Sequence, residues 1–417
     1  MVIGYAPFHG FVFKCTYSEK KLLENCDFKA LDQNLKNQLV CSGVLVKKGL
    51  VTEEKIHNKE NKRNVFIVTI LMTSECNMEC IYCYAKNEFK HTINIDTFKE
   101  TIIEVFEYCK NNFIGVIHFK IHGLGEPTVS SNDLFMMVDC VKKFSFAYKI
   151  KHNFSITTNG FFGEDLRGFL CDNFKSITIS YDGLPSLNNK NRLAISGENS
   201  SDLVLRNIKY FVCKEKDVKI RTTVVGTDTY LLPDIVSFLS DLGIKTVYVE
   251  PVAATGAAIG KSLLVNPHDF AKYYLKAKRK ASELGVSLNY SGGTIKRITM
   301  RHCGAYGNNF VITPLGKISL CYEVHMDSQN LTEKLLFKNF QEWLLATSKN
   351  LINEIDGECI NCFARYNCGG GCLVRRLSKN QETIEGFRGR CEITKVIIKN
   401  ELVNLLKIKE NKYLYID

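Results

Sequence analysis

The chain has 417 residues, of which 45% are apolar and 24% charged, and its formal net charge is +11. This composition is ordinary for a globular protein, and no apolar run is long enough to cross a bilayer, so we expect no membrane partner. The start, MVIGYAPFHGFVFK, lacks the basic stretch and long apolar core of a secretory signal, which favours a cytoplasmic location. Lys and Arg are spread along the chain rather than clustered, so a nucleic-acid partner is not indicated.

Residues 1–63 are expected to form a small separate module. A short strand candidate at 10–14 precedes a mixed helical stretch at 19–40 and an apolar run at 43–48. Such a module either captures a leader peptide by adding a strand to its sheet or acts as a lid on the next domain.

Residues 64–285 alternate between buried-strand and helical patterns. Short β-branched, apolar runs predict six strands, at 64–73, 115–123, 152–160, 176–183, 218–226 and 245–253. Helical apolar spacing follows most of them, at 94–112, 131–149, 201–215, 231–243 and 267–284. The sequence therefore predicts an α/β fold, a partial (β/α)6 TIM-like barrel whose chemistry gathers at the carboxyl ends of its strands.

Residues 286–417 are richer in Gly and Cys and poorer in regular periodicity, and they close with a helical run at 393–408. This pattern is typical of a domain organised by metal rather than by an apolar core. The chain contains seventeen cysteines, and without an export signal clustered cysteines more often bind metal or do chemistry than form disulfides. Seven of them sit mostly in apolar contexts and are expected to be small buried hydrophobes: Cys15, Cys26, Cys41, Cys109, Cys140, Cys171 and Cys213.

The first cysteine group, Cys76, Cys80 and Cys83, follows the first predicted barrel strand with the spacing C-x3-C-x2-C. Three thiolates on one loop can hold three irons of a [4Fe–4S] cluster and leave the fourth iron open to a small molecule. The alternative is a fragment of a zinc site, although no further His or Cys in this stretch supplies a fourth ligand.

This spacing, at the end of the first of six strands, resembles the radical S-adenosylmethionine (SAM) superfamily. Gly125, Glu126 and Pro127 end the second strand and are similar to the family's GGEP motif, with Leu124 in place of its first Gly. The resemblance implies that SAM is bound by side chains and backbone at successive strand ends, namely Tyr82, Gly125, Glu126, Pro127, Thr158, Asn159, Ser180, Arg192 and Val249. Arg192 is expected to pair with the SAM carboxylate, and Val249 to lie beside the adenine. The general base is not identified.

The second cysteine set comprises Cys303, Cys321, Cys359, Cys362, Cys368, Cys372 and Cys391. Seven cysteines exceed one tetrahedral zinc site, although the central block alone also fits a zinc ribbon. With Gly316, the set resembles the SPASM domain of peptide- and protein-modifying radical SAM enzymes. The resemblance implies one auxiliary [4Fe–4S] cluster on Cys303, Cys321 and Cys372, and a second on Cys359, Cys362, Cys368 and Cys391.

The first auxiliary cluster departs from some relatives in lacking an additional Cys just before Cys303. A substrate thiolate or another protein group is our hypothesis for its fourth ligand. The implied cofactors are thus SAM and three [4Fe–4S] clusters.

The resemblance implies an enzyme that cleaves SAM reductively to a 5′-deoxyadenosyl radical and abstracts hydrogen from a ribosomally made precursor peptide, forming a thioether or other crosslink. Its electron donor would be a flavodoxin or ferredoxin. The alternatives are an anaerobic sulfatase-maturating, formylglycine-forming enzyme and, outside enzymes, an iron–sulfur scaffold or electron carrier. Residues 1–63, 64–285 and 286–417 are the expected domains.

Overall fold

The fold is described from a computed structural model. It covers residues 2–7, 10–45, 65–85, 90–306, 309–323, 332–333, 359, 361–376, 378–408 and 413–415. Among the helices of these residues, none combines the length and apolar character needed to span a membrane.

Six parallel strands form the arc of a partial barrel. They pair side by side in the order β10-β9-β7-β6-β5-β3. Their bounds are β3 Val65–Leu71, β5 Val116–His122, β6 Lys151–Thr158, β7 Ser176–Ser180, β9 Asp217–Val224 and β10 Thr246–Pro251. The predicted α/β fold with six strand–helix units is confirmed.

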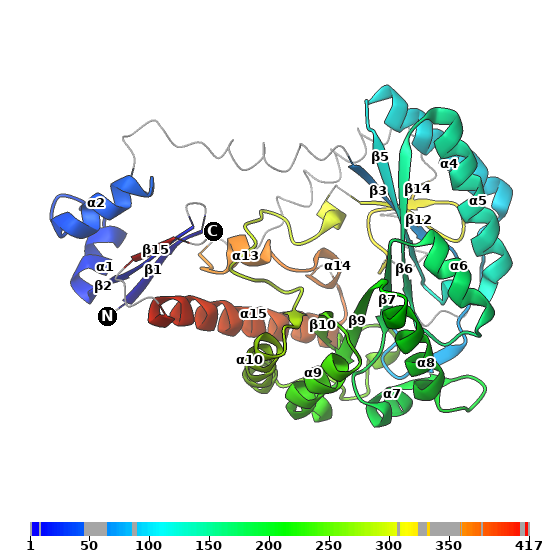
Figure 1. The fold of residues 1–417 in the computed structure, drawn as a ribbon. Helices are drawn as coiled ribbons and strands as arrows, with labels where there is room; N and C mark the ends of the chain where they lie inside the picture. Colours follow the sequence, from blue (N-terminus) through cyan, green and yellow to red (C-terminus); the bar gives the residue numbers. More distant parts are fainter. Residues whose placement is uncertain are drawn as a thin grey trace.

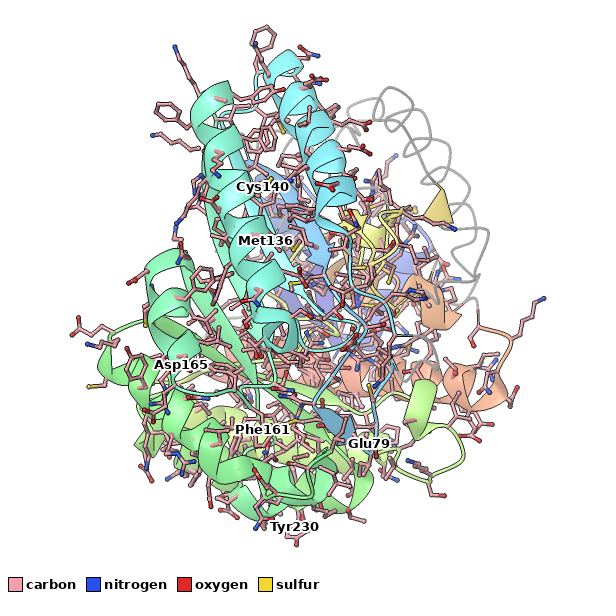
Figure 2. All side chains as sticks on the ribbon, turned by 90° about the vertical axis from the view of Figure 1, so that its right-hand side faces the viewer. Glu79, Met136, Cys140, Phe161, Asp165 and Tyr230 are labelled. Carbon is pink, nitrogen blue, oxygen red and sulfur yellow. The ribbon has the colours of Figure 1, made fainter. Side chains whose placement is uncertain are left out.

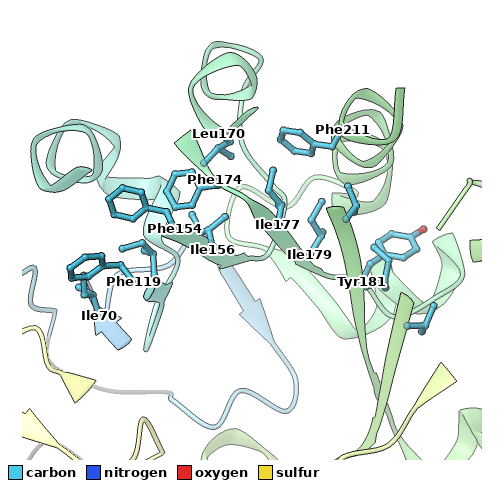
Figure 3. Packing of buried hydrophobic residues seen from close by; sticks show 14 of the residues in the cluster. Ile70, Phe119, Phe154, Ile156, Leu170, Phe174, Ile177, Ile179, Tyr181 and Phe211 are labelled. Carbon is cyan, nitrogen blue, oxygen red and sulfur yellow. The ribbon is translucent and has the colours of Figure 1, made fainter. Parts of the chain in front are cut away.

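Helices cover the convex face of the arc (Figure 1). They are α4 Ile95–Asn111, α5 Ser131–Tyr148, α6 Asp165–Asn173, α7 Pro185–Asn191, α8 Ser200–Cys213, α9 Leu232–Asp241 and α10 Pro267–Glu283. Alternate strand residues point toward these helices and bury one continuous core, in which Phe119, Phe154 and Ile177 lie between sheet and helices (Figure 3). The opposite, concave face of the strands carries more polar side chains and is where the strand ends can meet a ligand.

The residues after the barrel extend its sheet at both ends. β11 Ser287–Asn289 continues the sheet beside β10. β12 Phe310–Ile312 pairs in parallel with β3 and leads to β13 Ile318–Ser319 and β14 Thr332–Glu333, both antiparallel. The short helices α13 Arg365–Cys368 and α14 Leu373–Arg376 then lead to α15 Gln381–Ile408, which begins well before the helical run predicted at 393–408.

A small sheet at the other end of α15 joins both ends of the chain (Figure 1). β2 Phe11–Cys15 pairs antiparallel with β1 Val2–Ala6 on one side and with β15 Tyr413–Tyr415 on the other. Val12 packs with Ile398, Leu402 and Leu406 of α15. The expected helical stretch forms two helices, α1 Tyr17–Glu24 and α2 Gln33–Cys41, and most of the apolar run at 43–48 lies outside the described residues.

The seven cysteines outside the two sets differ in exposure. Cys15, Cys109 and Cys140 are buried as expected, and Cys171 is partly buried. Cys26, Cys41 and Cys213 are exposed, so the expectation of buried side chains is wrong for these three. Cys26 and Cys213 lie at or beside helix ends, where apolar neighbours in sequence do not imply burial.

Candidate functional site

The loop after β3 carries the first three cysteines and is held at two points. Within it, β4 Met78–Cys80 pairs antiparallel with β8 Arg192–Ala194, which places Cys80 opposite Arg192. The amide of Ile81 donates to the carbonyl of Asn191 at 2.9 Å. The loop is therefore fixed against the segment that follows β7.

The same loop is also held from the far end of the arc. The 3-10 turn η4 Gly256–Ala258 follows β10, and the amide of Ala257 donates to the carbonyl of Cys83 at 2.8 Å. A Cβ on Gly256 would lie 2.4 Å from that oxygen, so only glycine permits this approach. The ends of β3 and β10, which lie at opposite edges of the six-strand arc, thereby meet over the cysteine loop.

The three thiols of this loop lie close enough to affect one another. Burial raises the pKa of Cys76 to about 12, with further contributions from Glu126, Cys80 and Cys83. The pKa of Cys80 is about 11, raised first by burial and lowered in part by Arg192. Cluster binding therefore requires these thiols to lose protons to the metal.

Two N–H donors lie near the sulfurs. The Asn159 side-chain amide is 3.9 Å from Cys76 Sγ, and Arg192 Nη1 is 4.0 Å from Cys80 Sγ. In the described residues no group of three or more His, Cys, Asp or Glu side chains is arranged around a single metal ion. A four-iron cluster holds its thiolates further apart than one ion does, and three neighbouring thiols with N–H donors fit such a cluster.

Glu126 is the centre of a buried hydrogen-bond network next to the cysteines. Its Oε1 accepts from the Thr128 amide at 3.0 Å and from the hydroxyls of Thr128 and Thr158, each at 2.7 Å. Its Oε2 accepts from the Asn159 amide at 2.6 Å. Burial raises the Glu126 pKa, and these hydrogen bonds offset part of that shift. The carboxylate thus fastens the strand ends of β5 and β6 to each other.

Gly125 brings that strand end onto the cysteine loop. The Gly125 amide donates to Thr73 O at 2.9 Å, and the Glu126 amide donates to Glu75 O at 2.7 Å. A Cβ added to Gly125 would lie 1.9 Å from Glu75 O. Pro127 begins the 3-10 turn η2 Pro127–Ser130 and is buried.

Asn159 and Asn77 tie the cysteine loop to the end of β6. Asn159 Nδ2 donates to Asn77 Oδ1, and Asn77 Nδ2 donates to Phe161 O, both at 2.7 Å. Phe161 and Glu79 are labelled in the lower central part of Figure 2. Asn77 was not singled out from the sequence, because an Asn between two cysteines is common in any polar loop.

Tyr82 and Arg192 meet at Asp182, which follows β7. The Tyr82 hydroxyl donates to Asp182 Oδ2 at 2.6 Å, and Arg192 Nε donates to Asp182 Oδ1 at 3.0 Å. The Arg192 guanidinium also lies over the Tyr82 ring, 5.4 Å from its centroid. Burial disfavours the Arg192 charge, but Asp182, Tyr82 and Cys80 outweigh it and raise the Arg192 pKa. Arg192 is therefore held, charged, beside the Cys80 sulfur.

The last two expected cofactor contacts differ in position. Ser180 ends β7 on the concave face, opposite Arg221 of β9, and is partly buried. Val249 is fully buried within the main core, on the helix-covered side of β10, and the structure does not bring it to the other site residues. The next residue, Glu250, instead faces the concave side and accepts from Arg390 Nη2 of α15 at 2.7 Å.

The seven C-terminal cysteines fall into two neighbourhoods. Burial raises the pKa of Cys303, and the nearby Cys372 raises it further. The pKa of Cys321 is raised first by burial, then by Glu323, and then by Cys372 and Cys303. In the other neighbourhood, the Cys391 pKa of about 12 reflects burial, then Cys368 and Cys359. Burial also raises the pKa of Cys368, and Cys359 and Cys362 raise it further. The first neighbourhood thus contains Cys303, Cys321 and Cys372, and the second contains Cys359, Cys362, Cys368 and Cys391.

Comparison with known proteins adds sequence relatives. No model of a known protein family matches the chain. The radical SAM cyclopropyl synthase TigE of Paramaledivibacter caminithermalis is 22% identical over 87% of this chain and 78% of its own length. A cysteine-type anaerobic sulfatase-maturating enzyme of Clostridium perfringens is 22% identical over 81% of this chain and 96% of its own.

Solved structures share the fold. Native anSMEcpe with bound AdoMet superposes with a TM-score of 0.66 at 18% identity, over 82% of this chain and 99% of that one. Streptococcus suis SuiB bound to precursor peptide SuiA gives a TM-score of 0.57 at 16% identity, over 78% of this chain and 76% of that one. The resemblance expected from the motifs is confirmed, and the chain is a homologue of the radical SAM enzymes and therefore itself an enzyme.

Proposed function

We propose that the chain is a radical SAM maturase that acts on a ribosomally made peptide. The observation that carries this proposal is the partly buried three-thiol loop, fastened between the Glu126 network and the Asp182–Arg192 pair. A loop with no catalytic role has little need for three buried charged groups beside three thiols, because burying charge is costly.

Each group of the site has a role in this proposal. Cys76, Cys80 and Cys83 would hold three irons, and the bound cluster with SAM would supply the 5′-deoxyadenosyl radical chemistry. The N–H groups of Asn159 and Arg192 lie near two of the ligand sulfurs and stabilise their charge. Tyr82 and Asp182 keep Arg192 in position, and the backbone at Gly125 brings the end of β5 close to the same loop.

Two auxiliary clusters complete the proposed cofactor set, one on Cys303, Cys321 and Cys372 and the other on the remaining four cysteines of the C-terminal set. An electron donor of the flavodoxin or ferredoxin type would serve them, and the cytoplasm supplies the reducing conditions that keep the thiols available. The precursor peptide is supported by the SuiB structure, which has the same fold and binds one.

Two products remain candidates. Crosslinking of the peptide is the first, and conversion of a Cys or Ser side chain to formylglycine is the second, favoured by the sulfatase-maturating relative that aligns over 96% of its length. Mass spectrometry after anaerobic incubation with candidate peptides separates them. A loss of two hydrogens without reaction with a hydrazine indicates a crosslink, whereas an aldehyde that reacts with a hydrazine indicates formylglycine.

The proposal is tested by replacing Cys76, Cys80 and Cys83 together with Ala. We expect this variant to form no 5′-deoxyadenosine from SAM under a strong reductant, since the iron that binds SAM is lost. The matched control replaces the buried core cysteines Cys109 and Cys140 with Ala, which should retain SAM cleavage. Retained cleavage in the triple variant contradicts the site.

A further inference from the structure

The concave face of the barrel carries a guanidinium that the site described above does not use. In β9, Val218, Ile220 and Val224 point into the helix-covered core, so Arg221 lies on the opposite face. Its strand neighbours are Ser180 of β7 and Tyr248 of β10. Arg221 is therefore one strand away from the loop that holds Asp182 and Arg192.

Three aromatic rings line the same space. The His122 ring stacks on Tyr322 with centroids 4.9 Å apart, and Tyr84 meets Tyr322 edge-on at 6.3 Å. The Tyr84 hydroxyl donates to Gly123 O at 3.0 Å, which fixes that ring. Burial and then Arg221 lower the His122 pKa to about 4, so the imidazole is neutral and adds no second cation near Arg221.

The acidic groups near Arg221 are already paired with other arginines. Burial opposes the Arg221 charge, but Tyr322, Glu250 and Glu323 outweigh it and raise its pKa. Glu250 is paired with Arg390 at 2.7 Å, and Glu323 with Arg375 at 2.7 and 3.1 Å. Within the described part of the chain, Arg221 itself makes no side-chain hydrogen bond and no ion pair within 4.0 Å. Its planar donors are suited to a carboxylate.

We propose that Arg221 binds the carboxylate of an acidic side chain of the peptide substrate, beside the rings of His122, Tyr84 and Tyr322. This inference rests on the proposed function, because it names the substrate class of that reaction. The methionyl carboxylate of SAM offers the same chemistry, so the test must separate the two sources.

The test uses the full chain with its clusters reconstituted anaerobically, in the presence of SAM. Equilibrium dialysis compares the labelled peptide Ac-Gly-Ala-Ser-Glu-Ala-Gly-NH2 with its Gln counterpart. We expect the Glu peptide to bind the unmodified protein about tenfold more tightly, as a charge-assisted pair allows. Arg221→Gln should abolish that preference and Arg221→Lys should retain part of it. The control Lys219→Gln, on the same face of β9 and paired with Asp217, should leave it intact.

Two further measurements interpret the result. The SAM dissociation constant should be the same in Arg221→Gln and in the unmodified protein; weakened SAM binding with an intact peptide preference assigns the carboxylate to SAM and overturns the proposal. Absence of a Glu preference in the unmodified protein, or its persistence in Arg221→Gln, also overturns it. Formation of 5′-deoxyadenosine is assayed in parallel, so that a failed inference with intact SAM cleavage is distinguished from failure of the proposed function. Iron content and circular dichroism establish that each variant is folded.

Discussion

Gly125 illustrates how one residue type is required at the site. Its amide bonds to Thr73 O, and the space where a Cβ would lie is occupied by the Glu75 carbonyl at 1.9 Å. The sequence indicated Gly125 and Glu126 as a motif, but not what Glu126 contacts. Its four donors come from Thr128, Thr158 and Asn159, and the partner of Tyr82 and Arg192 is Asp182. Such pairings depend on how strand ends converge in space, which local spacing does not specify.

We predict that Gly125→Ala displaces the cysteine loop, because the contact is with backbone that has little freedom to move. The expected result is a loss of about 2 kcal/mol in stability, as for overpacked sites, together with lower iron content after reconstitution. Thermal unfolding and iron analysis measure the two effects. Gly163→Ala is the control, since no atom lies within 4 Å of its added Cβ. Equal iron content in both variants would count against the role assigned to Gly125.

At the scale of elements, the buried parallel strands were predictable and the short elements were not. All six barrel strands overlap their predicted ranges, because apolar, mostly β-branched residues recur at every second position, where they face the helices. The strands β11 to β14 have two or three residues each, too few to produce a period. The early start of α15 at Gln381 was missed because its first turns pack on the barrel end, with Thr383 donating to Ala254 O, rather than showing a clear apolar stripe.

The ion pair between Glu250 of β10 and Arg390 of α15 predicts how a substitution in it affects stability. Glu250→Gln removes the charge that pairs with Arg390 and leaves a buried guanidinium without its carboxylate, so we expect a loss of about 2 kcal/mol. Chemical denaturation of the reconstituted protein measures it. Glu283→Gln, which removes only an exposed charge 3.9 Å from Lys280, should change stability by less than about 0.5 kcal/mol.

The same carboxylate predicts a pH dependence. Burial alone would raise the Glu250 pKa, but Arg390 and Arg221 outweigh it and hold the pKa below its usual 4.5. A depressed carboxyl pKa gives stability that is present at neutral pH and lost as the pH falls through the folded-state value. The stability difference between the unmodified protein and Glu250→Gln should therefore shrink below pH 4.5. A difference that stays constant during acid titration would show that the charge is not responsible.

At the scale of the whole molecule, α15 connects the barrel to the small sheet of β1, β2 and β15. Cys391 and Arg390 lie in its first half, and Ile398, Leu402 and Leu406 pack on Val12 in its second half. The sequence indicated a helix here and a strand near residue 10. It gave no sign that strands from the two ends of the chain pair, since β15 is only three residues long.

Truncation after Ile408 removes β15 and exposes the edge of β2. We expect dilute protease to cleave within the first 45 residues about fivefold faster, because the sheet loses a strand, while SAM cleavage continues. Truncation after Tyr415 keeps β15 and is the control. Limited proteolysis followed by mass spectrometry measures the cleavage rate in both variants. Unchanged protection of the first 45 residues after truncation at Ile408 would refute the role of β15.

The pairing of β15 with β2 also constrains the order of events during synthesis. β2 leaves the ribosome early, whereas the strand that completes its sheet emerges only after the barrel and all ten clustered cysteines have been translated. Until then, one edge of β2 has no strand paired with it. The pairing that completes the sheet joins residues far apart in the sequence, so it has a very high contact order. The sheet can therefore be completed only after residues 413–415 have been translated, so its completion is a late folding event.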